Sequence, residues 1–401
     1  MDGVCKTLGL LVRRTLPVLA VMLAIGYASA ESTQSFDGFL AALWPDAEAK
    51  GIARTTFDAA FAGLTPDSRV LAATQRQPEY GKPFGAYIQS MVSPDRLAVG
   101  LRKSAQWSGT LRAVQKKFGV EPSILVSIWG IESSFGAAQD RWDVFRSLAT
   151  LAQAGFQHPY FRDELLSALE ILQSDHIARR QFVGSWAGAM GQTQFMPSSF
   201  LSYAVDFDGD SRPDIWSSVP DVLASIANYL QKAGWQPGVP WGFEVLVPQG
   251  FDYRLSRGTF REWAERGLKR ADGGRLPDTG NAILFFPSGA AGPGFLVTAN
   301  FDVLKSYNNS DAYALAVSHL SDRLRGLGPF RAAWPANDFQ PSRDERIALQ
   351  NKLAELGYKV EDFNGHIDFE LRDAVREMQE KFAMVPDGYP SRAFLDRIGI
   401  H

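Results

Sequence analysis

Glu132 combines a helical position with an apolar setting, and a carboxyl group placed in this way can act as a general acid. Residues 121–136 read as a helix, because Pro122 suits a first helical position and Gly136 suits the stop. Apolar residues recur along it at helical spacing: Ile124, Ile128, Ile131 and Phe135. Glu132 lies at the edge of this stripe, where burial raises the pKa of a carboxyl group and keeps it protonated near neutral pH. From the helix alone, a boundary glutamate that reaches water or pairs with an arginine is the commoner case.

A segment dense in glycine and alanine, residues 184–197, carries side chains that suit a sugar ligand. Gln192 and Gln194 stand two residues apart in it, after Ser185. An amide side chain offers a donor and an acceptor together, which matches the hydroxyl and amide groups of a sugar. Small residues also let the backbone approach closely, whether to a ligand or to another helix. The spacing alone leaves ligand binding and tight packing open.

An acidic loop at residues 206–214 predicts a site for a hard cation. Asp206, Asp208 and Asp210 can turn one side toward such an ion, as in oxygen-ligand calcium loops. The loop is not a regular EF-hand, because its glycine stands at the fourth position and the bidentate glutamate of the twelfth position is missing. Asp221 is expected to supply that bidentate ligand. The alternative is a solvated acidic turn, but crowded aspartates repel one another without a cation, so the metal site is favoured.

A further polar group lies near residue 310. Tyr307, Asn308 and Tyr313 combine aromatic faces with an amide, a composition that suits carbohydrate. Ser310 is expected to cap a helix over residues 313–325. Because helix entry also favours Asn and Ser, the local sequence is explained equally well without a ligand.

The elements that must position these residues are mostly helices. Helical patterns cover residues 35–113, 160–172 and 222–230. Strand-like runs with glycine-rich turns occur at residues 243–247, 282–286 and 295–297. We therefore predict a mainly α (α+β) domain with a small β region over residues 31–325.

A linker rich in Gly, Pro and Ala, residues 326–341, separates this domain from a compact tail, residues 342–401. Ser342 and Glu345 form a capping box at the start of a first helix in the tail. Asp368 caps a second helix, and a short third helix follows Ser391. No catalytic cluster stands out there, so the tail is predicted to be a small three-helix binding domain.

Residues 1–30 read as a secretory signal of the Sec type. A positive region is followed by a short apolar run, residues 16–25, and by a small-residue cleavage site at residues 28–30. The positive residues are Lys6, Arg13 and Arg14. Cys5, the only cysteine, precedes the apolar run, so it is not placed for lipoprotein acylation. We predict export to the periplasm with no membrane span after cleavage, an uncleaved anchor being the alternative.

The composition argues against a nucleic-acid partner. The net charge of −3 provides no basic footprint for a phosphate backbone. With 401 residues and 45% hydrophobic content, the chain can bury a sizeable core and has room for about two domains.

Taken together, these segments resemble the lytic murein transglycosylase B family (glycoside hydrolase family 103), which cleaves bacterial peptidoglycan. The resemblance covers nearly all of residues 35–325. It is carried by residues 131–133, 184–191, 194–197, 206–214, 227–229 and 307–313. Residues 342–401 separately resemble the three-helix peptidoglycan-binding module, through residues 349–358, 364–365 and 387–388.

The resemblance implies a lysozyme-like transglycosylase domain with Glu132 as the single general acid and base. It would cleave the bond between N-acetylmuramic acid and N-acetylglucosamine non-hydrolytically, giving 1,6-anhydro ends, which is an exception to the two-carboxylate rule. No catalytic cofactor is implied. The residues expected to line the cleft are Ser185, Gln194, Tyr229, Tyr307, Asn308 and Tyr313. The family's calcium site, taken as structural, would correspond to Asp206, Asp208, Asp210 and Asp221.

The expected partners are peptidoglycan glycan strands and other cell-wall enzymes, and the expected oligomeric state is a monomer. One departure concerns Gln157 and His158, which stand where an arginine pair is usual before Tyr160. This leaves the mode of stem-peptide recognition open. Two alternative functions are a lysozyme-like muramidase that uses water and a non-catalytic wall-binding protein.

Overall fold

Helices make up most of the chain in this computed structural model, which describes residues 35–74, 82–138, 141–174 and 177–401. Over these residues it has seventeen α-helices, a two-stranded sheet and a five-stranded sheet. The predicted mainly α fold with a small β region is confirmed. The predicted secretion signal, residues 1–30, lies outside the described residues. None of the described helices combines the length and hydropathy needed to cross a membrane.

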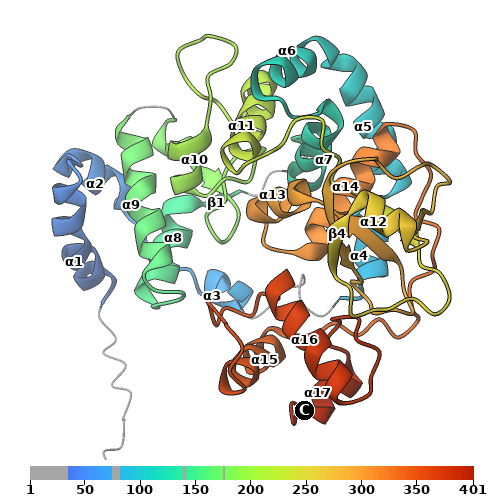
Figure 1. Cartoon of the computed structure of the whole chain (residues 1–401). Helices are drawn as coiled ribbons and strands as arrows, with labels where there is room; N and C mark the ends of the chain where they lie inside the picture. The colour runs from blue at the N-terminus through green and yellow to red at the C-terminus, as the bar shows by residue number, and fades with distance from the viewer. Residues whose placement is uncertain (1–34, 75–81, 139–140, 175–176) are drawn as a thin grey trace, which may run out of the picture. The chain divides into compact units, whose positions relative to one another are not determined.

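Two groups of helices surround two separate hydrophobic cores (Figure 1). The first group consists of α1 (Phe36–Ala49), α2 (Arg54–Phe61), α3 (Ser68–Thr74), α8 (Val144–Gln153), α9 (Tyr160–Gln173) and α10 (Pro197–Tyr203), with the strand pair β1 (Trp142–Asp143) and β2 (Val183–Gly184) and a 3-10 turn at Arg179–Gln181. The second consists of α4 (Phe84–Met91), α5 (Pro94–Gln106), α6 (Ser108–Phe118), α7 (Pro122–Ser133), α11 (Val219–Lys232), α13 (Ala299–Tyr307) and α14 (Asp311–Leu324). Tyr229 and Tyr307 pack against both cores, so they lie where the two groups meet.

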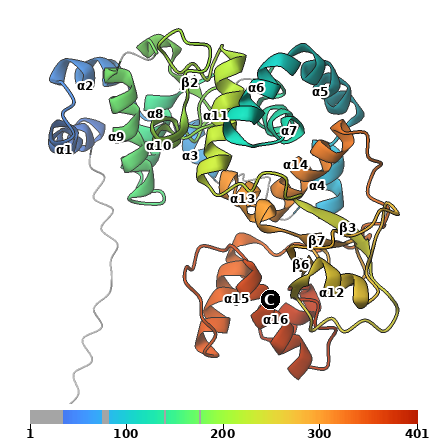
Figure 2. The same ribbon diagram turned by 45° about the horizontal axis from the view of Figure 1, so that its top comes forward.

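The five-stranded sheet is antiparallel, in the order β4-β6-β7-β3-β5. Its elements are β3 (Gly242–Leu246), β4 (Arg257–Thr259), α12 (Phe260–Glu265), β5 (Lys269–Arg270), β6 (Asn281–Phe285) and β7 (Gly294–Val297). Successive side chains of a strand point to opposite faces. Accordingly, Phe285 packs with the core of α7 and α14, while Leu284 packs with Trp263 of α12 on the other face. Figure 2 shows α12 beside the strands of this sheet. The three predicted strands are confirmed to within one residue at either end.

The C-terminal region contains α15 (Arg343–Glu355), α16 (Phe369–Lys381) and α17 (Arg392–Arg397) around a small core of their own. The predicted capping box is present: the Ser342 hydroxyl accepts from the Glu345 N–H, and the Glu345 carboxylate accepts from the Ser342 N–H. Asp368 and Ser391 cap the next two helices as predicted. The three-helix tail is therefore confirmed, while the domain boundaries stay a prediction.

His319 in α14 couples stability to pH. Its ring is 5% exposed and stacks on Phe330 with 3.8 Å between the ring centroids. Burial, assisted by the charge of Arg323, lowers the pKa of His319 from 6.5 to about 4. Between these two values the unfolded chain binds a proton that the folded chain does not bind. The contribution of neutral His319 to the free energy of unfolding is thus complete above the pKa that this histidine has in the unfolded chain. It is lost as the pH falls toward the pKa of His319 in the folded chain.

We expect the free energy of unfolding to fall by roughly 2–4 kcal/mol between pH 6.5 and pH 4 because of His319 alone. In His319→Leu this part of the pH dependence should disappear. Urea unfolding at several pH values would measure it, with His401→Gln as a control because that histidine is exposed. An unchanged slope in His319→Leu would contradict the prediction.

Candidate active site

Glu132 lies in the last turn of α7. The helix ends at Ser133, because Ser134 and Phe135 adopt left-handed backbone conformations with φ of 48° and 61°. The prediction that the helix continues to Gly136 is therefore wrong by three residues. The physical reason is the Phe135 ring, which folds back so closely over Gly130 that a Cβ there would lie 2.6 Å from it. This early stop brings the chain away from the helix directly after Glu132.

Two polar side chains hold the end of α7 in place. Arg96 of α5 donates from Nε to the Gly130 carbonyl at 3.1 Å. Gln192, which is 6% exposed, accepts from Trp129 Nε1 at 2.7 Å and donates to the Trp216 carbonyl at 2.8 Å. Buried polar groups that are fully paired make a local structure rigid. Gln192 therefore ties α7 to the glycine-rich segment, a role that its position in the sequence did not reveal.

The carboxyl group of Glu132 receives a hydrogen bond from Tyr313, which is 181 residues away in the sequence. The Tyr313 hydroxyl donates to Glu132 Oε1 at 2.6 Å, and its ring is 1% exposed. Burial, together with the nearby charge of Glu132, raises the pKa of Tyr313 well above its usual value, so the phenol remains a proton donor. The two residues come from α7 and α14, which pack side by side (Figure 1).

Further aromatic residues of the predicted set continue from Tyr313. The rings of Tyr307 and Tyr313 are parallel, with 6.4 Å between centroids, and Tyr229 lies 4.8 Å from Tyr307. The Tyr307 hydroxyl donates to the Thr193 carbonyl at 2.8 Å, next to Gln194. Tyr229 donates to the Ser306 carbonyl at the end of α13. Asn308 follows Tyr307 directly and caps the C-terminus of that helix.

The glycine-rich segment is a folded loop rather than a helix. Ser185 accepts from the Ala189 N–H at 3.0 Å, and Gln194 donates from Nε2 to the Gly191 carbonyl at 3.0 Å. A Cβ on Gly184 would overlap the Ala189 carbonyl oxygen, and one on Gly191 would lie 2.7 Å from the Ile215 carbonyl oxygen. Glycine is thus required for contact between backbones, which supports the packing explanation of the small residues.

The structure therefore joins most of the predicted cleft residues into one network. Tyr313 contacts Glu132 directly, Tyr307 and Tyr229 follow by ring contacts, and Gln194 is adjacent to the carbonyl that Tyr307 bonds. Ser185 lies elsewhere in the same loop, where its oxygen accepts backbone N–H groups. No contact made by these residues tests a role in binding substrate, so that role stays a prediction.

The acidic loop brings three predicted ligands together. Carboxylate oxygens of Asp206, Asp208 and Asp210 lie within 4.8 Å of one another. Asp221 is fully buried and uses both oxygens differently: Oδ1 accepts from the Phe207 N–H at 2.7 Å, and Oδ2 from the Asp214 N–H at 2.9 Å. Three converging carboxylates are a donor set that fits a hard cation such as Ca²⁺. Asp221 holds the ends of the loop together, and its role as a metal ligand stays a prediction.

The helix-rich fold, with a glutamate in the last turn of a buried helix, is lysozyme-like and is shared with solved lytic transglycosylases. Residues 35–322 match the transglycosylase SLT domain, and residues 342–398 match the peptidoglycan binding domain. The chain belongs to the transglycosylase SLT domain family, which consists of lyases that cleave peptidoglycan. The resemblance drawn from the sequence motifs is confirmed.

Relatives in two bacteria agree with this assignment. The chain is 32% identical to membrane-bound lytic murein transglycosylase B of Escherichia coli over 258 residues, which cover 60% of this chain and 68% of the relative. It is 44% identical to SltB3 from Pseudomonas aeruginosa in complex with NAG-anhNAM-pentapeptide, with a TM-score of 0.82 over 91% of this chain and 99% of that one. The Escherichia coli transglycosylase Slt35 in complex with calcium is 26% identical, with a TM-score of 0.59 over 72% of this chain and 92% of that one.

Proposed function

We propose that this transglycosylase uses Glu132 as its single general acid and base in the non-hydrolytic cleavage of peptidoglycan. The observation that carries the proposal is the 2.6 Å hydrogen bond from Tyr313 to Glu132 at the end of α7. It holds one carboxyl oxygen of Glu132 in a defined orientation. The last turn of a helix also disfavours a negative charge, which suits an acid that must arrive protonated.

The proposed reaction follows from one carboxyl group acting twice. Glu132 first donates its proton to the glycosidic oxygen, and the bond from that oxygen to C1 of N-acetylmuramic acid breaks. The N-acetyl oxygen of the same sugar bonds to C1 and stabilises its positive charge. Glu132, now a carboxylate, takes the proton of the C6 hydroxyl, whose oxygen bonds to C1 as the N-acetyl oxygen leaves. The product is a 1,6-anhydro end, and Glu132 regains its proton.

The predicted cleft residues would bind the sugars in two ways. Gln194 and Asn308 offer amide donors and acceptors for hydroxyl and N-acetyl groups. The hydroxyls of Tyr229 and Tyr307 donate to backbone carbonyls, so these residues would contact the sugars through their apolar ring faces. Ser185 would contribute its hydroxyl proton, because its oxygen already accepts from backbone N–H groups.

Mass spectrometry of digested murein tests the reaction type. We expect products that end in 1,6-anhydro-N-acetylmuramic acid, 18 mass units lighter than hydrolysis products because no water is added. The relative SltB3 was solved with such an anhydro compound, which supports this expectation. Reducing ends without anhydro ends would instead identify a lysozyme-like hydrolase, and intact murein would leave only wall binding.

We also propose that Asp206, Asp208 and Asp210, with Asp221 as the predicted fourth ligand, hold a structural Ca²⁺ ion. Their oxygens converge, and Slt35, to which the chain is similar, was solved in complex with calcium. The ion would neutralise the repulsion between three carboxylates and leave the reaction at Glu132 unassisted.

Calcium should stabilise the folded protein. At a concentration one hundred times the dissociation constant, we expect about 2.7 kcal/mol, or a rise in Tm of roughly 5 °C, relative to chelator-treated protein. Calorimetry with and without Ca²⁺ measures this. Asp208→Asn should reduce the response, while Asp278→Asn, which removes an exposed carboxylate elsewhere, should retain it. Equal Tm values in both conditions would rule the site out.

For location and partners we propose a periplasmic monomer that acts on peptidoglycan strands. Support comes from the peptidoglycan binding domain at residues 342–398 and from relatives that act on or bind cell-wall material. Other cell-wall enzymes are proposed as further partners. Fractionation of cells would test the location, and light scattering of the purified protein would test the oligomeric state.

A further inference from the structure

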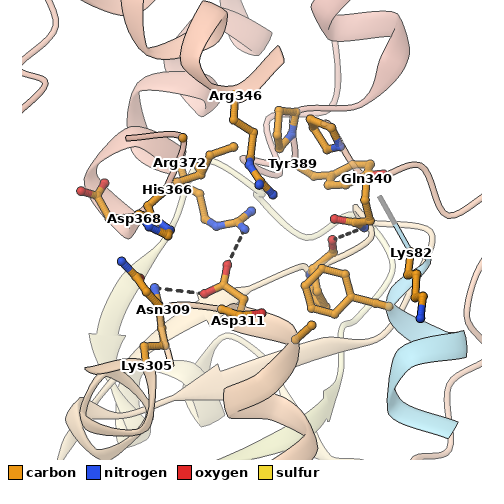
Figure 3. Close-up of a pocket in the computed structure, with 18 residues that line it drawn as sticks. Lys82, Lys305, Asn309, Asp311, Gln340, Arg346, His366, Asp368, Arg372 and Tyr389 are labelled. Atoms are coloured by element: carbon orange, nitrogen blue, oxygen red, sulfur yellow. Dashed lines mark hydrogen bonds and ion pairs between the residues drawn. The ribbon is translucent and has the colours of Figure 1, made fainter. Parts of the chain in front are cut away.

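The first turn of α14 is held by the C-terminal module, here meaning residues 342–401. Asp311 is the first residue of α14, and its side chain is 11% exposed. Its Oδ2 lies 2.8 Å from Arg372 Nη2 of α16, and its Oδ1 lies 3.0 Å from Lys305 Nζ of α13. Figure 3 shows Asp311 between these two cations in a pocket where the module meets α13 and α14.

Arg372 is buried and contacts both the module and the five-stranded sheet. Its side chain is 8% exposed, and its guanidinium lies 4.9 Å above the Phe285 ring of β6. Nη1 donates to the Gly388 carbonyl of the module at 3.5 Å. Burial alone would raise the pKa of Asp311, but Lys305 and Arg372 lower it overall, so Asp311 remains charged. A buried charge of this kind depends on its partners.

The same helical turn reaches the acid. Tyr313 is two residues beyond Asp311, and its N–H donates to the capping hydroxyl of Ser310 at 3.3 Å. Its phenol donates to Glu132 Oε1 at 2.6 Å. One short stretch, residues 310–313, therefore carries the helix cap, the ion pair with the module and the hydrogen bond to the acid.

We propose that Arg372 is a positioning residue for the cleavage step: by pairing with Asp311 it fixes the first turn of α14 and thereby the Tyr313 hydroxyl against Glu132. This inference rests on the proposed function of Glu132. It means that the wall-binding module contributes to the chemical step as well as to attachment. A small displacement of a group that orients a reacting atom is enough to slow a reaction strongly.

The test compares Arg372→Met with wild type on a soluble peptidoglycan glycan strand. We expect kcat to fall about tenfold while KM stays within about twofold, because the lost interaction acts on the reacting group. The pH–rate profile should move in the same direction as that of Tyr313→Phe. The double variant Arg372→Met/Tyr313→Phe should be no slower than Tyr313→Phe alone, since both changes disturb one hydrogen bond. Arg372→Lys should recover part of the rate.

Arg257→Met is the matched control. Arg257 also pairs with the module, at 3.0 Å from Glu370 and 3.2 Å from Asp373, but it extends from β4 and is exposed. The Arg257→Met enzyme should have the kcat and pH–rate profile of wild type. The comparison separates an effect on the position of Tyr313 from a general effect on docking of the module. Asp311→Asn removes the charge on the other side of the pair while keeping the shape of the side chain, and it should reproduce the effect of Arg372→Met. If Arg372→Met does not fold, Asp311→Asn takes its place in the test.

Three results would overturn the proposal. The first is a wild-type kcat and pH–rate profile in folded Arg372→Met or Asp311→Asn. The second is a double variant in which the losses of kcat from Arg372→Met and Tyr313→Phe multiply. The third is an Arg372→Met protein that loses only its binding to sacculi. Failure of the proposed function is a different result, since it would appear as absent anhydro ends in wild type or as an active Glu132→Gln enzyme.

Discussion

Glu132→Gln should abolish cleavage while leaving the folded protein and its attachment to sacculi intact. General acid and base catalysis contributes about 10²–10⁴-fold, and here one residue performs both steps, so we expect kcat to fall at least about 10³-fold. Glutamine has the same shape and keeps an oxygen that accepts the Tyr313 hydrogen bond. The loss would therefore be chemical rather than structural. Release of anhydro-muropeptides, followed by mass spectrometry, measures it.

Glu121→Gln provides the control at the other end of the same helix. Glu121 is the N-cap residue of α7, and its carboxylate accepts from Trp235 Nε1 at 3.1 Å. This variant should retain wild-type kcat. Equal Tm values and equal sacculus binding for the two variants would exclude unfolding as the cause of any loss. Continued release of anhydro products by Glu132→Gln would show that another residue supplies the proton.

Tyr313→Phe should have the second largest effect. Removing the hydroxyl takes away the 2.6 Å hydrogen bond to Glu132 Oε1, which helps to orient the carboxyl group. We expect kcat to fall about 10- to 100-fold with little change in KM, as for a group that stabilises the transition state. The pH–rate profile should also change, because the hydroxyl contacts the group that is proposed to transfer the proton.

Tyr253→Phe is a matched change in another core, where the tyrosine packs against Phe251 and Phe286. It should leave both kcat and the pH–rate profile unchanged. The Tyr313→Phe protein should also keep its Tm to within a few degrees, since the buried ring is retained. A Tyr313→Phe enzyme with an unshifted pH–rate profile would show that the hydroxyl does not act on the acid.

The structure adds a backbone-organising role to one residue in each of two candidate ligand motifs. Gln192 was one of two glutamines suited to a sugar, and its amide holds Trp129 and the Trp216 carbonyl. Asp221 was expected as a bidentate metal ligand, which stays a prediction, and its two oxygens also accept backbone N–H groups that close the loop. In both cases a polar side chain in a candidate ligand motif organises the backbone that carries the other candidates.

The sequence by itself determined the features that depend on neighbouring residues. Helical periodicity placed Glu132 in α7, and capping chemistry located Ser310, Ser342 and Asp368 at helix starts. Alternation and glycine-rich turns located the three central strands. These features could be predicted because caps, turns and apolar stripes act within about one or two turns of chain.

Only the tertiary structure decided how Glu132 is held. Glu132 and Tyr313 are 181 residues apart, Trp129 and Gln192 are 63 apart, and Asp311 and Arg372 are 61 apart. The early end of α7 likewise depends on the packing of Phe135 over Gly130. Such contacts form only when separate helices meet, because each side chain alone has no local preference for its distant partner. Local rules thus placed Glu132 in its helix, and packing between α7, α14 and the C-terminal module determined its surroundings.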